Sequence, residues 1–169
     1  ALNMLAVLSR RLRKFAALVE DRRTLAAQRG LELQLERARH LPRAFGDQRL
    51  LSQVFTNLLT NAMNYTPEGG QVTLRTAAYA TGSEVWVIGE VRDTGPGIPP
   101  EEQPLLFRRF FRGQASHRTG AAGTGPGLAT CKAITERPGG RITLHTDGLP
   151  GRGPALTALA KALSAPGSL

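Results

Sequence analysis

The sequence predicts a single domain of the α+β class, because helical and strand-like patterns both recur along its 169 residues. Apolar residues at three-and-four spacing predict helices at residues 2–29, after Asp47, and at residues 128–137. Alternating or short apolar runs predict strands at residues 31–36, 71–77, 84–92, 141–146 and 154–160. A hydrophobic content of 41% is sufficient for a core at this length.

The net charge is strongly positive, at +9, with 22 Lys and Arg against 13 Asp and Glu. Residues 1–50 carry part of the excess, either as a solvated helix face or as a contact for an acidic partner. Residues 105–118 hold four arginines and no acid beside glycine-rich sequence, which makes a phosphate ligand one interpretation. Aromatic residues make up only 5% and do not alternate with basic ones, so we expect no nucleic-acid partner.

The single cysteine, Cys131, excludes an internal disulfide and a cysteine-based metal cluster, and we expect it to be buried. The histidines show no metal-ligand spacing and are expected at the surface: His40, His117 and His145. No apolar run approaches the roughly 18 residues that span a bilayer, and no signal peptide pattern occurs. We therefore expect a cytoplasmic domain without direct membrane contact.

The second predicted helix carries two different faces. Asp47 is placed to cap its N-terminus, and the sequence ends it at residues 67–70 (PEGG). Its apolar face contains Leu50, Leu51, Val54, Phe55, Leu58, Leu59 and Ala62. Another face carries Asn57, Asn61 and then Asn64 or Tyr65. Asparagine is a poor residue inside a helix, so stacked carboxamides indicate either a magnesium site completed by phosphates or solvent-exposed side chains.

A carboxylate follows the apolar strand 84–92, in residues 93–97 (DTGPG). An ionised Asp93 accepts hydrogen bonds only, which suits an exocyclic amine such as that of adenine. Gly95 and Gly97 allow a sharp turn and the close approach of a flat ligand. The motif also occurs in ordinary turns, so by itself it leaves both interpretations open.

Two further segments bear on phosphate binding. Residues 98–102 (IPPEE) have the proline and acids of a helix start, and arginines and phenylalanines follow them. Residues 123–127 (GTGPG) open the helix 128–137, whose N-terminus offers backbone N–H groups to phosphates. The loop is neither a Walker loop nor a dinucleotide fingerprint. We expect residues 112–123, bounded by glycines, to form a mobile lid.

These motifs, in this order, resemble the boxes of sensor histidine kinases. Residues 57–62 with 65–67 resemble the N box, 93–99 the G1 box, 106–113 the F box and 123–129 the G2 box. The resemblance covers nearly the whole chain. It implies a catalytic ATP-binding domain of the GHKL superfamily with the Bergerat fold. That fold is an α/β sandwich in which helices cover one face of a mixed, mostly antiparallel sheet.

The resemblance also implies roles for single residues. Asp93 takes the adenine amine, Asn61 holds Mg²⁺, and Asn57 and Arg112 act at the phosphates as catalytic residues. The remaining nucleotide-binding positions implied are Asn64, Tyr65, Gly95, Gly97, Ile98, Phe107, Gly123, Thr124, Gly125, Gly127 and Leu128. Phe107 and Phe110 would anchor the lid. The implied cofactors are ATP and Mg²⁺.

Residue 57 indicates which subclass of this fold the chain resembles. ATP-hydrolysing members of this fold carry a glutamate one turn before the magnesium asparagine, whereas Asn57 cannot take a proton. The implied activity is transfer of the γ-phosphate to a histidine on a dimerisation hairpin. Residues 1–10 resemble only the end of the second helix of that hairpin. Residues 11–163 would be the catalytic domain and 164–169 a loose tail. The implied partners are that hairpin and a response regulator, within a homodimeric parent protein that an inner membrane could anchor.

Alternatives remain at this point. The chain departs from the family at Asn64, where a basic residue is usual, and at Pro126, which removes one N–H from the glycine loop. Both departures favour a degenerate module that binds nucleotide or a partner and has weak or no kinase activity. An ATPase clamp is disfavoured by the missing glutamate, and an anti-sigma-factor kinase by the residues 107–112 (FRRFFR).

Overall fold

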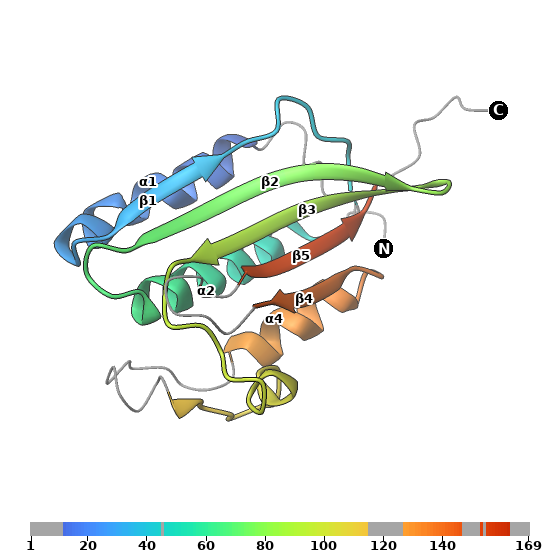
Figure 1. The fold of residues 1–169 in the computed structure, drawn as a ribbon. Helices are drawn as coiled ribbons and strands as arrows, with labels where there is room; N and C mark the ends of the chain where they lie inside the picture. Colours follow the sequence, from blue (N-terminus) through green and yellow to red (C-terminus); the bar gives the residue numbers. More distant parts are fainter. Residues whose placement is uncertain (1–11, 45, 115–126, 147–152, 154, 163–169) are drawn as a thin grey trace.

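Five strands form one mixed sheet with helices behind it in the computed structural model of the chain (Figure 1). The structure describes residues 12–44, 46–114, 127–146, 153 and 155–162. The expected end of the dimerisation helix at 1–10, the tail 164–169 and the lid residues 115–123 lie outside these ranges. The elements are α1 Leu12–Gln28, β1 Glu32–Glu36, α2 Gln48–Tyr65, β2 Gln71–Thr81, β3 Glu84–Asp93, a 3₁₀ helix η1 Gln103–Leu105, α4 Gly127–Glu136, β4 Arg141–His145 and β5 Ala155–Lys161.

The strand order is β1-β2-β3-β5-β4. Only β1 and β2 pair in parallel, and the other neighbours are antiparallel. This confirms the predicted α+β class with a mixed, mostly antiparallel sheet. The β2–β3 hairpin is its longest unit and runs from Val72 opposite Asp93 to Thr81 opposite Glu84. The hairpin therefore determines where Asp93 emerges from the sheet.

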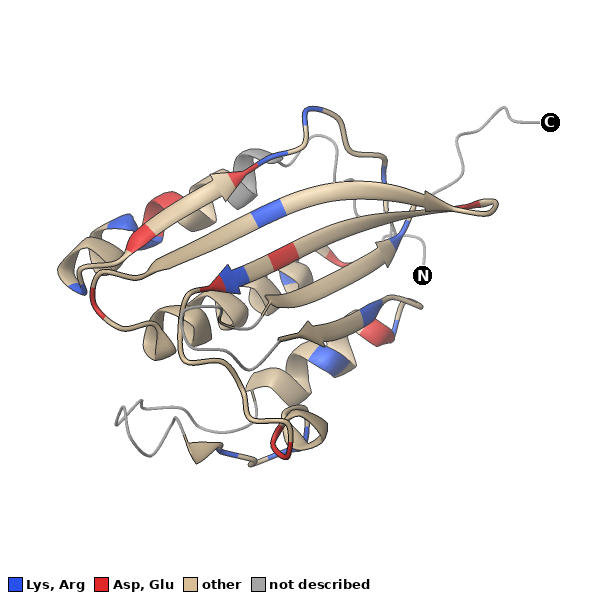
Figure 2. Cartoon of the chain, viewed as in Figure 1, with Lys and Arg blue, Asp and Glu red and all other residues tan. Residues whose placement is uncertain are grey.

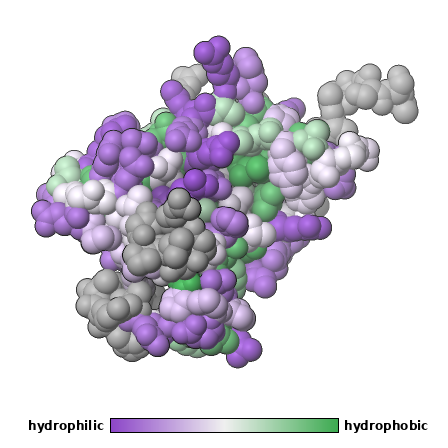
Figure 3. Space-filling model, in the orientation of Figure 1, coloured by the Kyte–Doolittle hydropathy of each residue, from purple (hydrophilic) through white to green (hydrophobic). Residues whose placement is uncertain are grey.

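The core lies between the sheet and the helices. Val72 and Leu74 alternate with more exposed residues in β2, and Leu58 and Leu59 of α2 are fully buried with them. A Cβ on Gly89 would lie 2.1 Å from the Phe55 ring, so this glycine lets α2 approach β3 closely. The opposite face of the sheet is turned to the viewer in Figure 3 and mixes hydrophilic with hydrophobic residues. Charged positions of both signs are scattered over it in Figure 2.

The cap of α2 is confirmed. Asp47 accepts hydrogen bonds from Arg49 N at 2.7 Å and Leu50 N at 3.1 Å. The sequence placed Leu50 on the apolar face of α2, but this side of the helix is not fully covered, and Leu50 is 37% exposed. Only one of the two adjacent leucines can face the core at this turn, and Leu51 does so.

The helix expected from residues 98–102 does not form. Pro99 O accepts from both Glu102 N and Gln103 N, which closes a turn that passes into η1. Pro104 explains the failure, because a helix beginning at Pro99 would need an N–H at 104 to donate to Pro100 O. The other predicted helices and strands are present with shifted ends within the described residues.

Candidate functional site

Asp93 is the last residue of β3, and its carboxylate turns into the protein. The residue is 6% exposed, and Oδ1 accepts a hydrogen bond from Gly95 N at 2.7 Å. Burial raises the pKa of Asp93 to about 6, against the lowering effect of the Gly95 bond. A buried carboxylate that keeps acceptor capacity beyond one backbone bond is suited to a ligand with an N–H group.

Two glycines pack closely against this carboxylate. A Cβ on Gly95 would lie 2.7 Å from Asp93 Oδ1 and 3.1 Å from Tyr65 O. A Cβ on Gly153 would lie 2.1 Å from Asp93 Oδ1 and 2.7 Å from Gly95 N. Gly97 has a φ of 77°, which a residue with a side chain rarely adopts. Gly153 was not predicted as a site residue, because it lies far from Asp93 in the sequence.

Hydrogen bonds hold both ends of the loop that follows Asp93. Thr94 N donates to Gln71 O at 3.1 Å, and Thr94 Oγ1 accepts from Gln71 N at 2.9 Å. At the other end, Gln103 Nε2 donates to Ile98 O at 3.0 Å. Gly97 and Ile98 are half-buried. The loop is therefore held in shape by the protein itself, beside the C-terminal end of α2.

The asparagines of α2 lie on one helix face, at spacings of four and three residues. Asn57 Nδ2 donates to Cys131 Sγ of α4 at 3.7 Å, and Asn64 Oδ1 accepts from Arg29 Nη1 at 2.7 Å. Asn61 lies between them and is half-buried. Tyr65 ends the helix, with its backbone oxygen beside Gly95. Neither Cys131 nor Arg29 was predicted as a site residue, because both contacts join distant segments.

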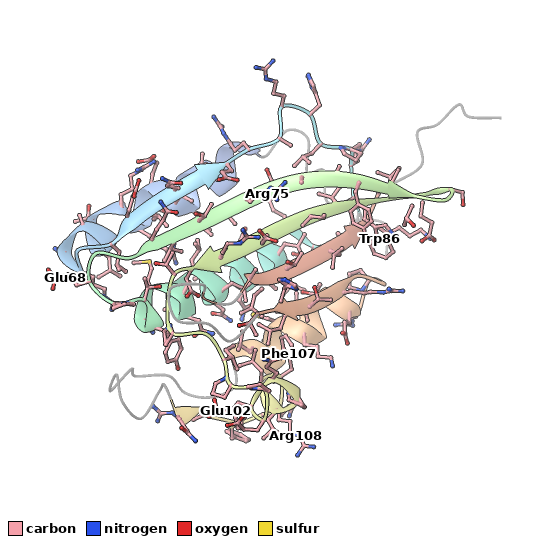
Figure 4. The ribbon with its side chains drawn as sticks, in the orientation of Figure 1. Glu68, Arg75, Trp86, Glu102, Phe107 and Arg108 are labelled. Carbon is pink, nitrogen blue, oxygen red and sulfur yellow. The ribbon has the colours of Figure 1, made fainter. Side chains whose placement is uncertain are left out.

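The segment after η1 carries the phenylalanines and arginines. Phe107 packs against the core, with Lys132 Nζ 5.8 Å from its ring centroid, and lies next to α4 in Figure 4. Phe110 is 77% exposed with a φ of 63°, so the expectation that it anchors this segment is wrong. Arg112 is exposed. The buried Glu102 accepts a hydrogen bond from Gln114 N at 2.9 Å, which holds the end of the described segment.

α4 starts at Gly127, one residue earlier than expected, and its first turn contains no acidic side chain. A Cβ on Gly127 would meet nothing within 4 Å, and Leu128 is half-buried. Among the described residues, nothing would contact a Cβ at this helix start and its first turn holds no acid, which suits anion binding. Gly123, Thr124, Gly125 and Pro126 lie outside the described residues.

The sequence matches the family described as histidine kinase-, DNA gyrase B-, and HSP90-like ATPase over residues 46–162. The chain belongs to this ATPase family, and its sheet with helices on one face is the Bergerat fold. Among the described residues, no helix is long and apolar enough to cross a bilayer.

The relatives found are sensor kinases. The adaptive-response sensory kinase SasA of Parasynechococcus marenigrum (strain WH8102) is 43% identical over 130 residues, 76% of this chain and 32% of SasA. Full-length ShkA, crystallised in complex with AMPPNP, aligns with a TM-score of 0.77 and 27% identity over 95% of this chain and 32% of ShkA. The mycobacterial sensor histidine kinase MprB aligns with a TM-score of 0.67 and 26% identity over 89% of this chain and 97% of that one. This chain spans about a third of the length of its curated relatives.

Proposed function

We propose that the chain is the ATP-binding kinase domain of a sensor histidine kinase. It transfers the γ-phosphate of ATP to a histidine on a dimerisation hairpin of its parent protein. The observation that carries the proposal is the buried Asp93 carboxylate, cradled by Gly95 and Gly153 beside the asparagine face of α2. The sensor kinases among the relatives support the same assignment.

Asp93 reads the base. Its ionised carboxylate accepts a hydrogen bond from the adenine amine, and Gly95 donates to Oδ1 and so fixes the direction of the side chain. The backbone at Gly97 and Ile98 and the ring of Tyr65 line the base and the ribose. Both glycines are needed for the position of this carboxylate, because a Cβ on either Gly95 or Gly153 would clash with Oδ1.

The asparagines and the start of α4 hold the phosphates. Bound Mg²⁺-ATP supplies the phosphoryl group and the metal that neutralises its charge. The carboxamide oxygen of Asn61 is a hard ligand of the kind that Mg²⁺ accepts alongside phosphates and water. The N–H groups at Gly127 and Leu128 point out of the open end of α4, and we expect Gly123, Thr124 and Gly125 to continue this contact. Arg112 completes the phosphate contacts.

Asn57 favours transfer over hydrolysis. A carboxamide cannot accept a proton from water, and the Asn57 amide nitrogen is directed to Cys131. The residue therefore positions the phosphate side of the site without activating water. A degenerate binding module is not favoured, since the relatives found are kinases.

The relatives support a wider assignment. We propose that residues 11–163 form the catalytic domain, and that a cytoplasmic response regulator receives the phosphate from the hairpin. The parent protein would be a homodimer. The test mixes this chain with a dimerisation hairpin from a related kinase and radiolabelled ATP. We expect an acid-labile, base-stable phosphohistidine on the hairpin and none on this chain; labelling of His40, His117 or His145 instead would overturn the proposal.

A further inference from the structure

Arg29 forms a side-chain contact between α1 and the asparagine face of α2. It follows the last residue of α1, and its backbone N–H bonds to Leu25 O and Ala26 O. Gly30 then turns the chain at a φ of 65°, and Gly69 N donates to Gly30 O at 2.8 Å. The backbone below Arg29 is thus fixed both to α1 and to the loop after α2.

The guanidinium lies at the end of the asparagine face. Arg29 Nη1 donates to Asn64 Oδ1 at 2.7 Å, one helical turn from Asn61. A guanidinium has five N–H donors, and this bond uses one of them. Tyr65, the next residue, has its backbone oxygen against the loop of Gly95. Arg29 therefore contacts the asparagine face at the end of α2 that lies beside the Gly95 loop.

The charge of Arg29 is not paired with a carboxylate among the described residues. Other cations of the chain are paired, such as Arg23 with Glu20 and Lys161 with Glu84. Glu68 packs against Gly30, yet within the part of the chain that the structure describes no ion pair joins Glu68 to Arg29. An arginine held by an amide alone retains its full charge for a ligand.

The bond also orients Asn64. Because its carboxamide oxygen accepts from Arg29, its Nδ2 group is left as a donor on the other side of the amide. The pair then presents N–H donors with a positive charge, which is complementary to a phosphate. The rest of the face is uncharged, since Asn57 and Asn61 carry neutral amides.

We propose that Arg29 is a phosphate-binding residue of this site, and that Asn64 orients its guanidinium. The proposal rests on the proposed nucleotide-binding function. Arg29 contributes the positive charge that the asparagine face lacks, and it does so from the turn after α1, outside the family match at residues 46–162.

The test compares Arg29→Ala, Arg29→Lys and Asn64→Ala in the 169-residue chain. Arg23→Ala, in the preceding helix α1, is the matched control. ATP with Mg²⁺ is titrated by calorimetry, and adenosine is titrated by NMR as a probe of the base alone. We expect Arg29→Ala to weaken ATP about tenfold, as for one lost charged hydrogen bond, and to leave adenosine unchanged. The lysine variant recovers part of the loss, Asn64→Ala loses less than Arg29→Ala, and Arg23→Ala binds as wild type.

The outcomes separate the two proposals. An unchanged ATP affinity in Arg29→Ala, in a chain that otherwise binds ATP, overturns the role of Arg29 and leaves the proposed function standing. Equal losses for ATP and adenosine, with a lower melting temperature, would show that Arg29 only joins α1 to α2. If the wild-type chain binds neither ligand, the proposed function fails and the role of Arg29 fails with it.

Discussion

Asn57 and Cys131 meet between α2 and α4, where Asn57 Nδ2 lies 3.7 Å from Cys131 Sγ. The thiol in turn donates to Val54 O at 3.8 Å, one turn earlier in α2. The thiol hydrogen is thereby used, so the sulfur acts as acceptor toward the amide. The Asn57 nitrogen is directed to α4, and its carboxamide oxygen is left for the ligand side.

Cys131→Ala should therefore loosen Asn57. The variant loses the acceptor for the amide and leaves a small gap, and we expect about 1 kcal/mol of lost stability with a few-fold weaker Mg²⁺-dependent ATP binding. Cys131→Ser retains a donor and an acceptor and serves as the control for orientation. Urea unfolding and calorimetry at two magnesium concentrations measure both effects. Identical ATP affinities in the alanine and wild-type chains would show that the thiol does not position Asn57.

The same thiol should be unreactive in the folded chain. Cys131 is fully buried, and burial raises the pKa of its thiol to about 11, so it stays neutral at pH 7. It is the only cysteine in the sequence, so a thiol reagent reports on it alone. We expect labelling by a disulfide reagent to be slow in buffer and complete in urea. Rapid labelling of the native chain would contradict its place between α2 and α4.

Stability should depend on pH through Asp93. Burial raises the pKa of this carboxyl from 3.8 to about 6, so the folded chain holds the proton more tightly than the unfolded chain. The stabilising contribution is complete below pH 3.8 and is lost as the pH rises through 6. The pKa difference corresponds to at most about 3 kcal/mol.

Asp93→Asn measures this effect directly, because asparagine does not titrate. We expect the variant to gain stability relative to wild type as the pH increases from 4 to 7 in urea unfolding without nucleotide. The exposed Asp21→Asn is the control for the same acid-to-amide change at the surface. A constant difference between Asp93→Asn and wild type across this range would contradict the burial of the carboxylate.

Gly153→Ala should damage the base pocket. Its Cβ would lie 2.1 Å from Asp93 Oδ1, so the carboxylate or the loop must move. We expect nucleotide affinity to fall by at least tenfold and stability by about 1–3 kcal/mol. Gly127→Ala makes the same change where the Cβ meets nothing within 4 Å, and its stability should be preserved. Wild-type affinity in Gly153→Ala would show that the cradle is not needed.

Short-range sequence patterns predicted the backbone elements that carry the site. The apolar run before Asp93 placed its carboxylate at a strand end, Asp47 capped α2, and the glycine-rich stretch opened α4 close to the expected residue. Each of these features depends on neighbours within a few residues. Chain-local signals are sufficient for such features because they set backbone geometry directly.

The contacts that complete the site were not predictable in this way. Arg29 meets Asn64 across 35 residues and Asn57 meets Cys131 across 74, and only the packing of three helices brings these residues together. Phe110 shows a different failure, since the family resemblance implied an anchoring role for a residue that is 77% exposed. Its φ is 63°, and Phe107, three residues earlier, packs against the core instead.

The central claim is that Asp93 reads the adenine base of ATP. The most direct measurement is calorimetric titration of ATP and Mg²⁺ into the wild-type chain and into Asp93→Asn at pH 7.5, where the carboxyl is ionised. We expect saturable binding to wild type and a loss of about 1.5–3 kcal/mol of binding free energy in the variant, because an acceptor facing the adenine amine becomes a donor. Equal affinity of the two chains for ATP would contradict it.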